Sequence, residues 1–331
     1  MSEASLPSKR RRLALQDYTV GWVCALPIEY AAATSMLDEE HEEPHNENDT
    51  NIYTLGRIFS RNVVIVCLPA GLIGSASATA AAIEMKAKFP KIQFGLLVGV
   101  GGGVPGGTTD IRLGDVVVSQ PHLRHGGVVQ YDFGKQYPNG FLRTGFLNTP
   151  PKYLLNAVSK LISNHIRGKN TFLDHLAAAT SQPVFAREKA RKDVLFKPTY
   201  THVEGKMCKN CRKEEIIQRA PRPGQDYRIH YGTIASGSSL IRDAQTRDRL
   251  SSQLDGAICF EMEATGLMNH FPCLVIRGIC DYADSHKNKL WQPYAAATAA
   301  ACAKELLSII PQAAGAQGKC SCSEKKPLFK T

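Results

Sequence analysis

The sequence has no apolar run that reaches the roughly 18 residues needed to cross a bilayer. It also has no apolar segment behind the charges near its N-terminus, which a secretory signal would need. We therefore expect no membrane contact, no secretion and a cytoplasmic location. Cysteine usage agrees, because half of the ten cysteines lie in or beside apolar, strand-like runs, as free buried thiols of a reducing compartment do: Cys24, Cys67, Cys259, Cys273 and Cys280.

Most of the chain also lacks an excess of positive charge, although the net charge is +10. Residues 1–16 contribute +3, residues 187–228 contribute +6, residues 315–331 contribute +3, and the rest of the chain carries −2. The basic charge therefore belongs to the two ends and to one internal segment. This distribution argues against nucleic acid as a partner.

The two ends are expected to be basic tails around a single domain. Residues 1–17 lack aromatic or periodic apolar content, so we expect them to be disordered, and we expect a flexible tail over residues 312–331. The Lys/Arg run at 9–12 fits a solvated tail better than a nuclear localisation signal, and a nuclear location stays open. Residues 18–311 then form one domain, with residues 187–228 as a basic insert.

Signatures of common cofactor sites are missing as well. The apolar run 94–98 leads into a glycine-rich segment, and seven of the thirteen residues from Gly95 to Gly107 are glycine. We expect a turn there, whose backbone N–H groups could cradle phosphate. The Gly-Lys-Ser/Thr of a Walker A loop is absent, and no helix signal follows that would complete a Rossmann fingerprint. We expect no cofactor.

A metal site is not expected either. Cys208 and Cys211 form a lone CxxC without a second one. His202 and His230 are candidates for a third and a fourth ligand, but their spacing is irregular, which leaves a four-ligand zinc site poorly supported.

The most informative stretch that is present covers residues 258–284. A short apolar run ends in the triplet 261–263, Glu-Met-Glu, at the mouth of an expected helix, and a second apolar run, residues 273–279, is followed by Asp281 and Asp284. This pattern predicts a right-handed βαβ unit that brings the two strand ends side by side, where open α/β sheets bind ligands. Carboxylates without a nearby nucleophile favour hydroxyl binding and proton transfer. Alternatively, the two glutamates only stabilise a helix N-terminus.

Further strands and helices are expected along the chain. Pro27 at a first helical position starts a helix after an apolar run and places Glu29 in its first turn. The expected strands cover residues 18–26, 52–55, 63–68, 94–98 and 229–235, and the expected helices cover residues 75–89, 151–166, 236–254 and 291–310.

Two separated motifs resemble those of one family. The tetrapeptide 261–264, EMEA, and residues 277–284, RGICDYAD, are similar to the signature of the purine nucleoside phosphorylase/nucleosidase superfamily. Within it the chain most resembles fungal phosphorylase-like domains and 5′-methylthioadenosine/S-adenosylhomocysteine nucleosidases. The resemblance implies a single α/β domain with a central mixed, twisted β-sheet flanked by helices, in a nucleoside phosphorylase-like three-layer fold. It also implies a purine nucleoside or nucleotide as the ligand and a homo-oligomer, dimeric or larger.

The resemblance assigns roles to the acidic residues. Asp281 matches the general acid that protonates N7 of the leaving purine, and an aspartate there suits a 6-amino base, which points to adenine compounds. Glu263 matches the acceptor of the ribose 2′- and 3′-hydroxyls, with Met262 beneath the sugar and Glu261 beside it. Glu29 matches the residue that binds or activates the attacking water.

The resemblance also implies residues that line the substrate site. The loop with Gly71 and Gly74 would approach the ribose, and the backbone at Leu240 and Ile241 would hydrogen-bond the purine. Arg277 either orients the loop that carries the acid or forms a structural ion pair.

One departure from the family bears on the reaction. Hexameric phosphorylases have Arg two residues before the glycine that starts the glycine-rich turn and Ser just after it, whereas this chain has Leu97 and Val100 around Gly99. The missing guanidinium removes a bidentate phosphate ligand, so we expect an N-ribohydrolase that uses water. A phosphate-dependent purine nucleoside phosphorylase and a non-catalytic, nucleoside-binding signalling domain of the same fold remain alternatives. The acidic set formed by Glu29, Glu263 and Asp281 argues against the second of them.

Overall fold

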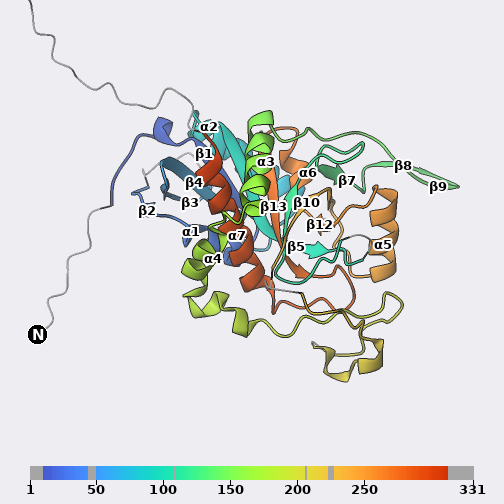
Figure 1. Cartoon of the computed structure of the whole chain (residues 1–331). Helices are drawn as coiled ribbons and strands as arrows, with labels where there is room; N and C mark the ends of the chain where they lie inside the picture. The colour runs from blue at the N-terminus through green and yellow to red at the C-terminus, as the bar shows by residue number, and fades with distance from the viewer. Residues whose placement is uncertain (1–9, 44–49, 107–108, 206, 223–226, 312–331) are drawn as a thin grey trace, which may run out of the picture.

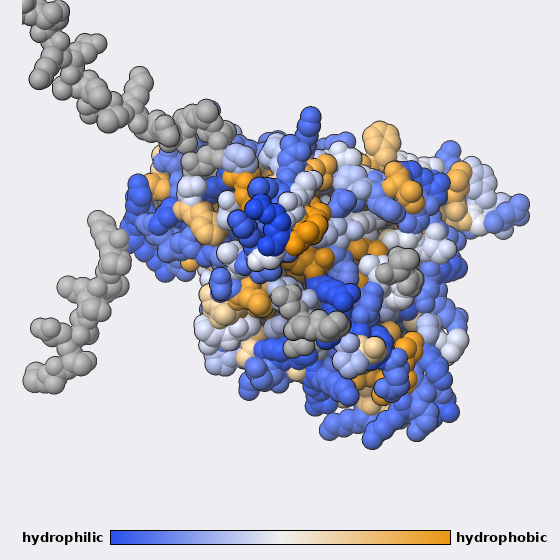
Figure 2. Space-filling model, in the orientation of Figure 1, coloured by the Kyte–Doolittle hydropathy of each residue, from blue (hydrophilic) through white to orange (hydrophobic). Residues whose placement is uncertain are grey.

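The computed structural model describes residues 10–43, 50–106, 109–205, 207–222 and 227–311. The predictions for the far ends of both tails, residues 1–9 and 312–331, lie outside these residues. None of the described helices combines the length and the apolar character that a membrane span needs. The face of the molecule seen in Figure 2 is mainly hydrophilic, with exposed apolar residues in separate patches.

A mixed β-sheet forms the middle layer of the domain (Figure 1). Its strands follow the order β10-β6-β13-β5-β1-β4-β3-β2, and β11, β12 and β7 continue it from the end of β5. A two-stranded hairpin, β8-β9, stands apart from it. The strands are β1 Val20–Cys24, β2 Glu39–Glu40, β3 Tyr53–Ile58, β4 Arg61–Cys67, β5 Phe94–Gly103, β6 Val116–Ser119, β7 Val128–Gln130, β8 Gly134–Tyr137, β9 Gly140–Arg143, β10 Ile229–Gly232, β11 Ile234–Ser236, β12 Cys259–Glu261 and β13 Cys273–Asp281.

Helices cover both faces of this sheet. They are α1 Pro27–Thr34, α2 Ser75–Lys88, α3 Lys152–Ile166, α4 Phe172–Thr180, α5 Ala244–Gln253, α6 Ala264–Leu267 and α7 Gln292–Ile309. The 3-10 turns are Leu15–Asp17, Pro183–Phe185, Arg187–Lys189, Cys208–Asn210 and Lys213–Glu215. The expected α/β class, with a central mixed sheet between helices, is confirmed.

The glycines of the central strands show which helices lie on which face. Gly21 of β1 faces Met85 of α2, whereas a Cβ on Gly278 of β13 would lie 1.8 Å from the Ala295 carbonyl oxygen of α7. The register pairs Gly278 with Val100, so that Arg277, one residue earlier, points to the face opposite α7. The alanine-rich sequence of α7 is explained by this close approach to the sheet.

The sheet core is buried on both sides, and the sequence explains why. Every residue of β1 and β13 is buried. Continuous apolar runs without alternation are typical of strands that are covered by helices on both faces. The core therefore provides a rigid platform whose strand ends can hold polar side chains in fixed positions.

The predicted βαβ unit over residues 258–284 is wrong. Phe260 of β12 and Asp281 of β13 both pair with Gly102 of β5, so β5 lies between the two strands. β12 runs antiparallel to β5, and β13 runs parallel to it. The long strand β5 takes both partners, and no local sequence pattern encodes that long-range choice.

The glycine-rich turn predicted after residue 98 is also wrong, because β5 continues through it to Gly103. Side chains from neighbouring strands occupy the space that Cβ atoms would need. A Cβ on Gly101 would lie 2.6 Å from Cys259 Sγ, and one on Gly103 would lie 2.8 Å from Ile279 Cγ2. These glycines therefore serve close packing within the sheet.

Two further boundaries differ from the predictions. The helix expected over residues 236–254 begins only at Ala244, because Asp243 caps it by accepting the Thr246 N–H at 2.7 Å. Residues 10–17, assigned to a disordered tail, pack on the domain instead. The Arg11 carbonyl accepts the Glu42 N–H at 2.9 Å, and Leu15–Asp17 forms a 3-10 turn.

The basic insert, residues 187–228, is tied to the domain by its own cations. Arg222 pairs with the fully buried Asp115 at 2.6 Å. Arg219 pairs with Asp193 of the insert itself at 2.7 Å and reaches the domain by donating to the Tyr282 hydroxyl oxygen at 2.7 Å. Part of the insert's positive charge is therefore neutralised inside the chain.

Candidate active site

A buried arginine surrounded by carboxylates occupies the middle of β13. Arg277 is 1 % exposed. Its Nη2 donates to the Glu261 carboxylate and to Glu263 Oε2, the latter at 3.2 Å, and its Nη1 contacts the Val100 carbonyl oxygen at 3.4 Å. One of the two roles predicted for Arg277, a structural ion pair, is thus present. This ion pair joins the end of β12 to β13.

The two glutamates at the end of β12 have different surroundings. Glu261 accepts the N–H groups of Glu263 and Ala264 at 3.0–3.2 Å, so it closes the turn that starts α6. Glu263 accepts the Gly74 N–H at 3.2 Å and is 5 % exposed. Glu261 is therefore committed to the fold, while Glu263 has fewer protein partners and can accept bonds from a ligand.

Glu29 reaches the same arginine from the start of α1. Its Oε2 accepts the N–H groups of Ala25 and Leu26 at 2.8 and 2.9 Å, and its Oε1 accepts the Val100 N–H at 2.7 Å. Pro27 begins the helix, and the strand–helix junction folds back so that this first-turn acid points over β5.

Glycine at position 99 allows the side chains of Glu29 and Arg277 to lie together above β5. A Cβ there would lie 2.5 Å from Arg277 Nη1 and 2.5 Å from Glu29 Oε1. Only a glycine leaves room for both side chains above β5. Gly99 therefore supports the site by its lack of a side chain, and its conformation is that of an ordinary strand residue.

The cluster of Arg277, Glu29, Glu261 and Glu263 holds three carboxyl groups for one guanidinium. Burial, opposed by Arg277 and assisted by Glu261 and Glu29, raises the pKa of Glu263 to about 7. Burial also raises the pKa of Glu29, against Arg277 and the backbone N–H groups. Burial alone would lower the pKa of Arg277, but the three glutamates outweigh it and raise that pKa. Such a site attracts a cation.

Asp281 lies at the end of β13 and is paired with a lysine. Its Oδ1 accepts the Ala283 N–H at 2.9 Å, and its Oδ2 lies 2.9 Å from Lys287 Nζ. Burial would lower the pKa of Lys287, but Asp281 outweighs this and raises it, so the ammonium stays charged. Gly102 is again required beneath the pair, because a Cβ there would lie 2.9 Å from Asp281 Oδ1.

A cleft opens beside this ion pair. It is bounded by the ends of β5, β12 and β13 and by the loop between β11 and α5. Its lining residues are Gly102, Ser239, Leu240, Ile241, Phe260, Glu261, Met262, Asp281, Ala283 and Lys287. One aromatic ring, aliphatic side chains and a few charged groups, among them the carboxyl of Asp281, are a suitable lining for a flat heteroaromatic base.

The loop that carries Leu240 and Ile241 is held from the segment after β7. Asp132 Oδ2 accepts the Ser238 N–H at 2.6 Å, and the Tyr131 hydroxyl donates to the Ser239 carbonyl oxygen. Leu240 is 51 % exposed at the mouth of the cleft. Its position follows from these loop contacts, since the helix begins later than predicted.

Most of the predicted site residues are brought together, although they come from distant segments. The arginine cluster and the cleft contain all of them except three glycines: Gly74 and Gly99 border the cluster, and Gly71 is exposed and has nothing within 4 Å of a Cβ position. Gly74 is buried and donates its N–H to Glu263. Sequence reasoning missed Lys287 and Phe260. The only signal for them was proximity in sequence to CDYAD and EMEA, because neither residue belongs to a recognisable pattern.

Comparisons with known proteins give the family and the fold. The model of the phosphorylase superfamily matches residues 19–310. A nucleotide-binding leucine-rich repeat (NLR)-like protein of Hyaloscypha variabilis is 46 % identical over 92 % of this chain and 31 % of its own length. The ATP nucleosidase Cap17 of Escherichia coli is 25 % identical over 83 % of this chain and 48 % of its own length. The chain thus spans about a third to a half of these two relatives.

Among solved structures, a 5′-methylthioadenosine/S-adenosylhomocysteine nucleosidase of Colwellia psychrerythraea, in complex with adenine, superimposes with a TM-score of 0.57. The match covers 90 % of this chain and 98 % of that one at 16 % identity. At this identity the likeness establishes the fold.

Proposed function

The chain belongs to the phosphorylase superfamily, and on this premise we propose that it is an N-ribohydrolase. Its substrates would be adenosine-type nucleosides or nucleotides, cleaved at the N-glycosidic bond to free adenine and the ribose moiety. The observation that carries the proposal is the buried cluster of three glutamates around Arg277, next to a cleft that ends at Asp281.

The cluster suits a reaction that builds positive charge on a sugar. Glycosidic cleavage passes through a ribosyl cation, and fixed carboxylates stabilise such a charge without reorganising. A unit charge about 4 Å from one carboxylate gains on the order of 4 kcal/mol at an effective dielectric constant of about 20. Glu263 would accept the ribose 2′- and 3′-hydroxyls, and Met262 would lie beneath the sugar.

The leaving base needs a proton at N7. The Asp281–Lys287 pair lines the cleft that would hold this base. In this arrangement Asp281 would take up a proton when the substrate binds, hand it to N7 as the glycosidic bond breaks and accept a hydrogen bond from the 6-amino group. Lys287 is the cation that compensates the carboxylate left behind. Adenine compounds are therefore the expected substrate class.

Water is the expected nucleophile, and Glu29 would take its proton. The Val100 N–H, which a phosphate ion could otherwise use, already donates to Glu29, and Leu97 is a fully buried core residue. The guanidinium groups of Arg112 and Arg124 bind Asp110 and Asp255 respectively. An anion at this place would be poorly held, because a buried charge without a partner is costly.

The first test is therefore the phosphate dependence of cleavage. Adenosine, methylthioadenosine, ATP and inosine would each be incubated with the full chain, with and without millimolar phosphate, and the products separated. We expect free adenine and the free ribose moiety at the same rate in both buffers. Strict dependence on phosphate, with a ribose 1-phosphate product, would establish a phosphorylase instead. The panel also distinguishes ATP from methylthioadenosine, the compounds in the names of the two nucleosidases to which the chain is similar.

The raised pKa of Glu263 predicts an acid limb in the pH profile. Glu263 must be ionised to accept ribose hydroxyls and stabilise the cation, and its pKa is about 7. We expect kcat/KM to fall as the pH drops below about 7, measured at constant ionic strength between pH 5.5 and 8. A flat profile over that range would remove Glu263 from this role.

Stability should change in the opposite direction. Between its ordinary value of 4.5 and about 7, Glu263 binds more protons in the folded chain than in the unfolded one. Its contribution to stability is therefore present at low pH and is lost as the pH rises through about 7. As the pH rises toward about 7, we therefore expect kcat/KM to increase while the stability of the ligand-free protein decreases.

A further inference from the structure

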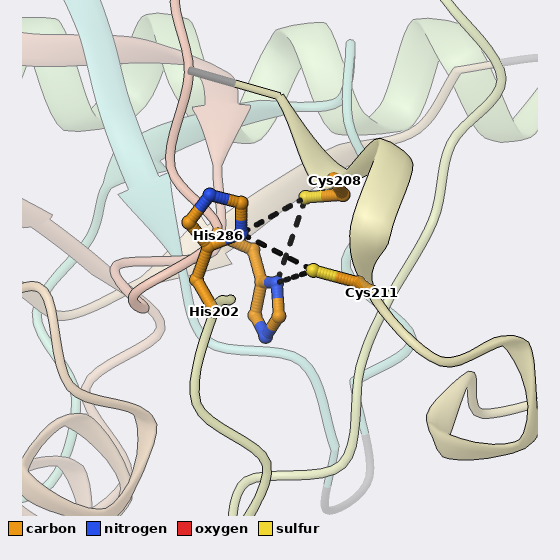
Figure 3. Close-up of side chains that lie close together, drawn as sticks. All are labelled: His202, Cys208, Cys211 and His286. Atoms are coloured by element: carbon orange, nitrogen blue, oxygen red, sulfur yellow. Dashed lines mark hydrogen bonds between the residues drawn. The ribbon is translucent and has the colours of Figure 1, made fainter. Parts of the chain in front are cut away.

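Four metal-ligating side chains meet where the insert, residues 187–228, packs against the loop after β13. His202, Cys208 and Cys211 belong to the insert, and His286 follows the end of β13 by five residues. Figure 3 shows the four side chains turned toward one common point. One ligand atom from each residue lies within 4.8 Å of all the others.

The spacing of these atoms fits a tetrahedron around one ion. Nδ1 of His202 lies 3.2 Å from Cys211 Sγ and 3.7 Å from Cys208 Sγ. Nδ1 of His286 lies 3.5 Å from Cys208 Sγ and 3.8 Å from Cys211 Sγ. A tetrahedral zinc ion with bonds of about 2.3 Å to sulfur and about 2.0–2.1 Å to nitrogen requires sulfur–nitrogen edges of about 3.6 Å.

Hydrogen bonds among the four side chains cannot explain all of these contacts. Nε2 of His202 lies 2.8 Å from the Gly205 carbonyl oxygen, and Nε2 of His286 lies 3.0 Å from that of Tyr200. Both rings therefore carry their proton on Nε2 and direct the Nδ1 lone pair at the sulfur atoms. Two thiols have two protons, so they can satisfy two of the four contacts. A cation satisfies all four, and carbonyl acceptors behind the histidines are typical of metal sites.

The surroundings hold this set of ligands in place. Cys211 is 9 % exposed and so is His286. The His286 ring stacks on Phe196 with centroids 3.9 Å apart, and Tyr200 stacks at 5.6 Å. Four protein ligands without an open position are typical of structural zinc, and two thiolates with two imidazoles select zinc over magnesium or calcium.

We propose that His202, Cys208, Cys211 and His286 bind one structural Zn²⁺, which fastens the insert to the loop that follows Asp281. Sequence spacing had suggested no metal and had offered His230 as the fourth candidate. His230 lies instead 2.8 Å from Asp115 in another part of the sheet. The fourth ligand comes from a loop that is 75 residues beyond Cys211.

The ion would act on the candidate active site through this loop. The His202 N–H donates to Ser285 Oγ at 3.0 Å, and the residue after His286 is Lys287, the partner of Asp281. Fixing His286 therefore fixes the position of the Asp281–Lys287 pair. This consequence for turnover rests on the proposed function, whereas zinc binding itself does not.

The test starts with the metal content of the full chain, purified without chelators or an affinity tag that binds metal. We expect one zinc per chain by elemental mass spectrometry. X-ray absorption at the zinc edge should show two sulfur neighbours at about 2.3 Å and two nitrogen neighbours at about 2.0 Å. Zinc-free protein with a Cys208–Cys211 disulfide, seen as a loss of two hydrogens by mass spectrometry, would overturn the proposal.

Matched variants locate the ligands. The pair Cys208→Ser/Cys211→Ser should lose the zinc, and the control pair Cys320→Ser/Cys322→Ser should keep it. His286→Asn should lower zinc retention under competition with a chromogenic chelator, and His230→Asn should not. The opposite pattern in either comparison would refute the ligand set. Should a variant fold poorly, the absorption spectrum of the unaltered chain decides alone.

Discussion

Replacing Asp281 by asparagine is expected to lower turnover on adenine nucleosides by about 10²- to 10⁴-fold, the usual contribution of a positioned proton donor. Asparagine keeps the shape of the side chain but cannot transfer a proton to N7. The measurement is the single-turnover rate on adenosine, with inosine as a second substrate. Adenosine should be affected more strongly, because Asp281 also accepts from the 6-amino group.

A second effect of this substitution has to be separated from the first. Asp281→Asn leaves the Lys287 ammonium, 2.9 Å away, without its carboxylate. The double variant Asp281→Asn/Lys287→Met removes both charges. If the orphaned cation caused the defect, the double variant would recover turnover. If the loss of the proton donor caused the defect, the double variant would stay inactive. Asp174→Asn, an exposed aspartate in α4, is the surface control and should retain full activity.

Replacing Arg277 by methionine is expected to destabilise the fold by about 3–5 kcal/mol, the usual result of removing one partner from a buried ion pair. Three glutamates would then be left buried without the guanidinium. The pKa values of Glu29 and Glu263 would rise further, because Arg277 is the charge that lowers them. The loss of stability should therefore be larger at pH 8 than at pH 5, where the carboxyl groups take up protons.

Urea unfolding at pH 5 and pH 8 measures the loss of stability in Arg277→Met, with Arg124→Met as the matched control. Arg124 also pairs with an aspartate, but its side chain is 69 % exposed, so its loss should cost about 0–1 kcal/mol. Equal stability of the two variants, or a loss at position 277 that does not depend on pH, would show that the cluster is not electrostatically coupled.

The candidate acids could be identified from sequence because each lies in a local pattern. Glu29 lies in the first turn of a helix that Pro27 starts, Glu263 lies in EMEA, and Asp281 follows an apolar run. Local patterns of this kind depend on neighbours within a few residues. The family resemblance built on them is confirmed by the match over residues 19–310.

Strand partners could not be predicted in the same way. β12 and β13 are joined by a short segment, which favoured a βαβ unit, yet β5 lies between them. The same long-range pairing explains the glycines from Gly99 to Gly103. Their spacing suggested a phosphate-binding turn, whereas the strand needs them because neighbouring side chains occupy the space of their Cβ atoms: Arg277 and Glu29 at Gly99, Cys259 at Gly101, Asp281 at Gly102 and Ile279 at Gly103.

The sequence by itself indicated most of the strands and helices and the apolar core, because these depend on composition and periodicity, and the family resemblance of its motifs indicated the three acidic residues proposed for the reaction. Only the tertiary structure decided which charges meet. Lys287 reaches Asp281, Arg277 pairs with Glu261 and Glu263, and His286 lies beside Cys208 and Cys211. Such partners come from segments far apart in the chain, and their distances depend on the packing of the whole sheet, which no local spacing records.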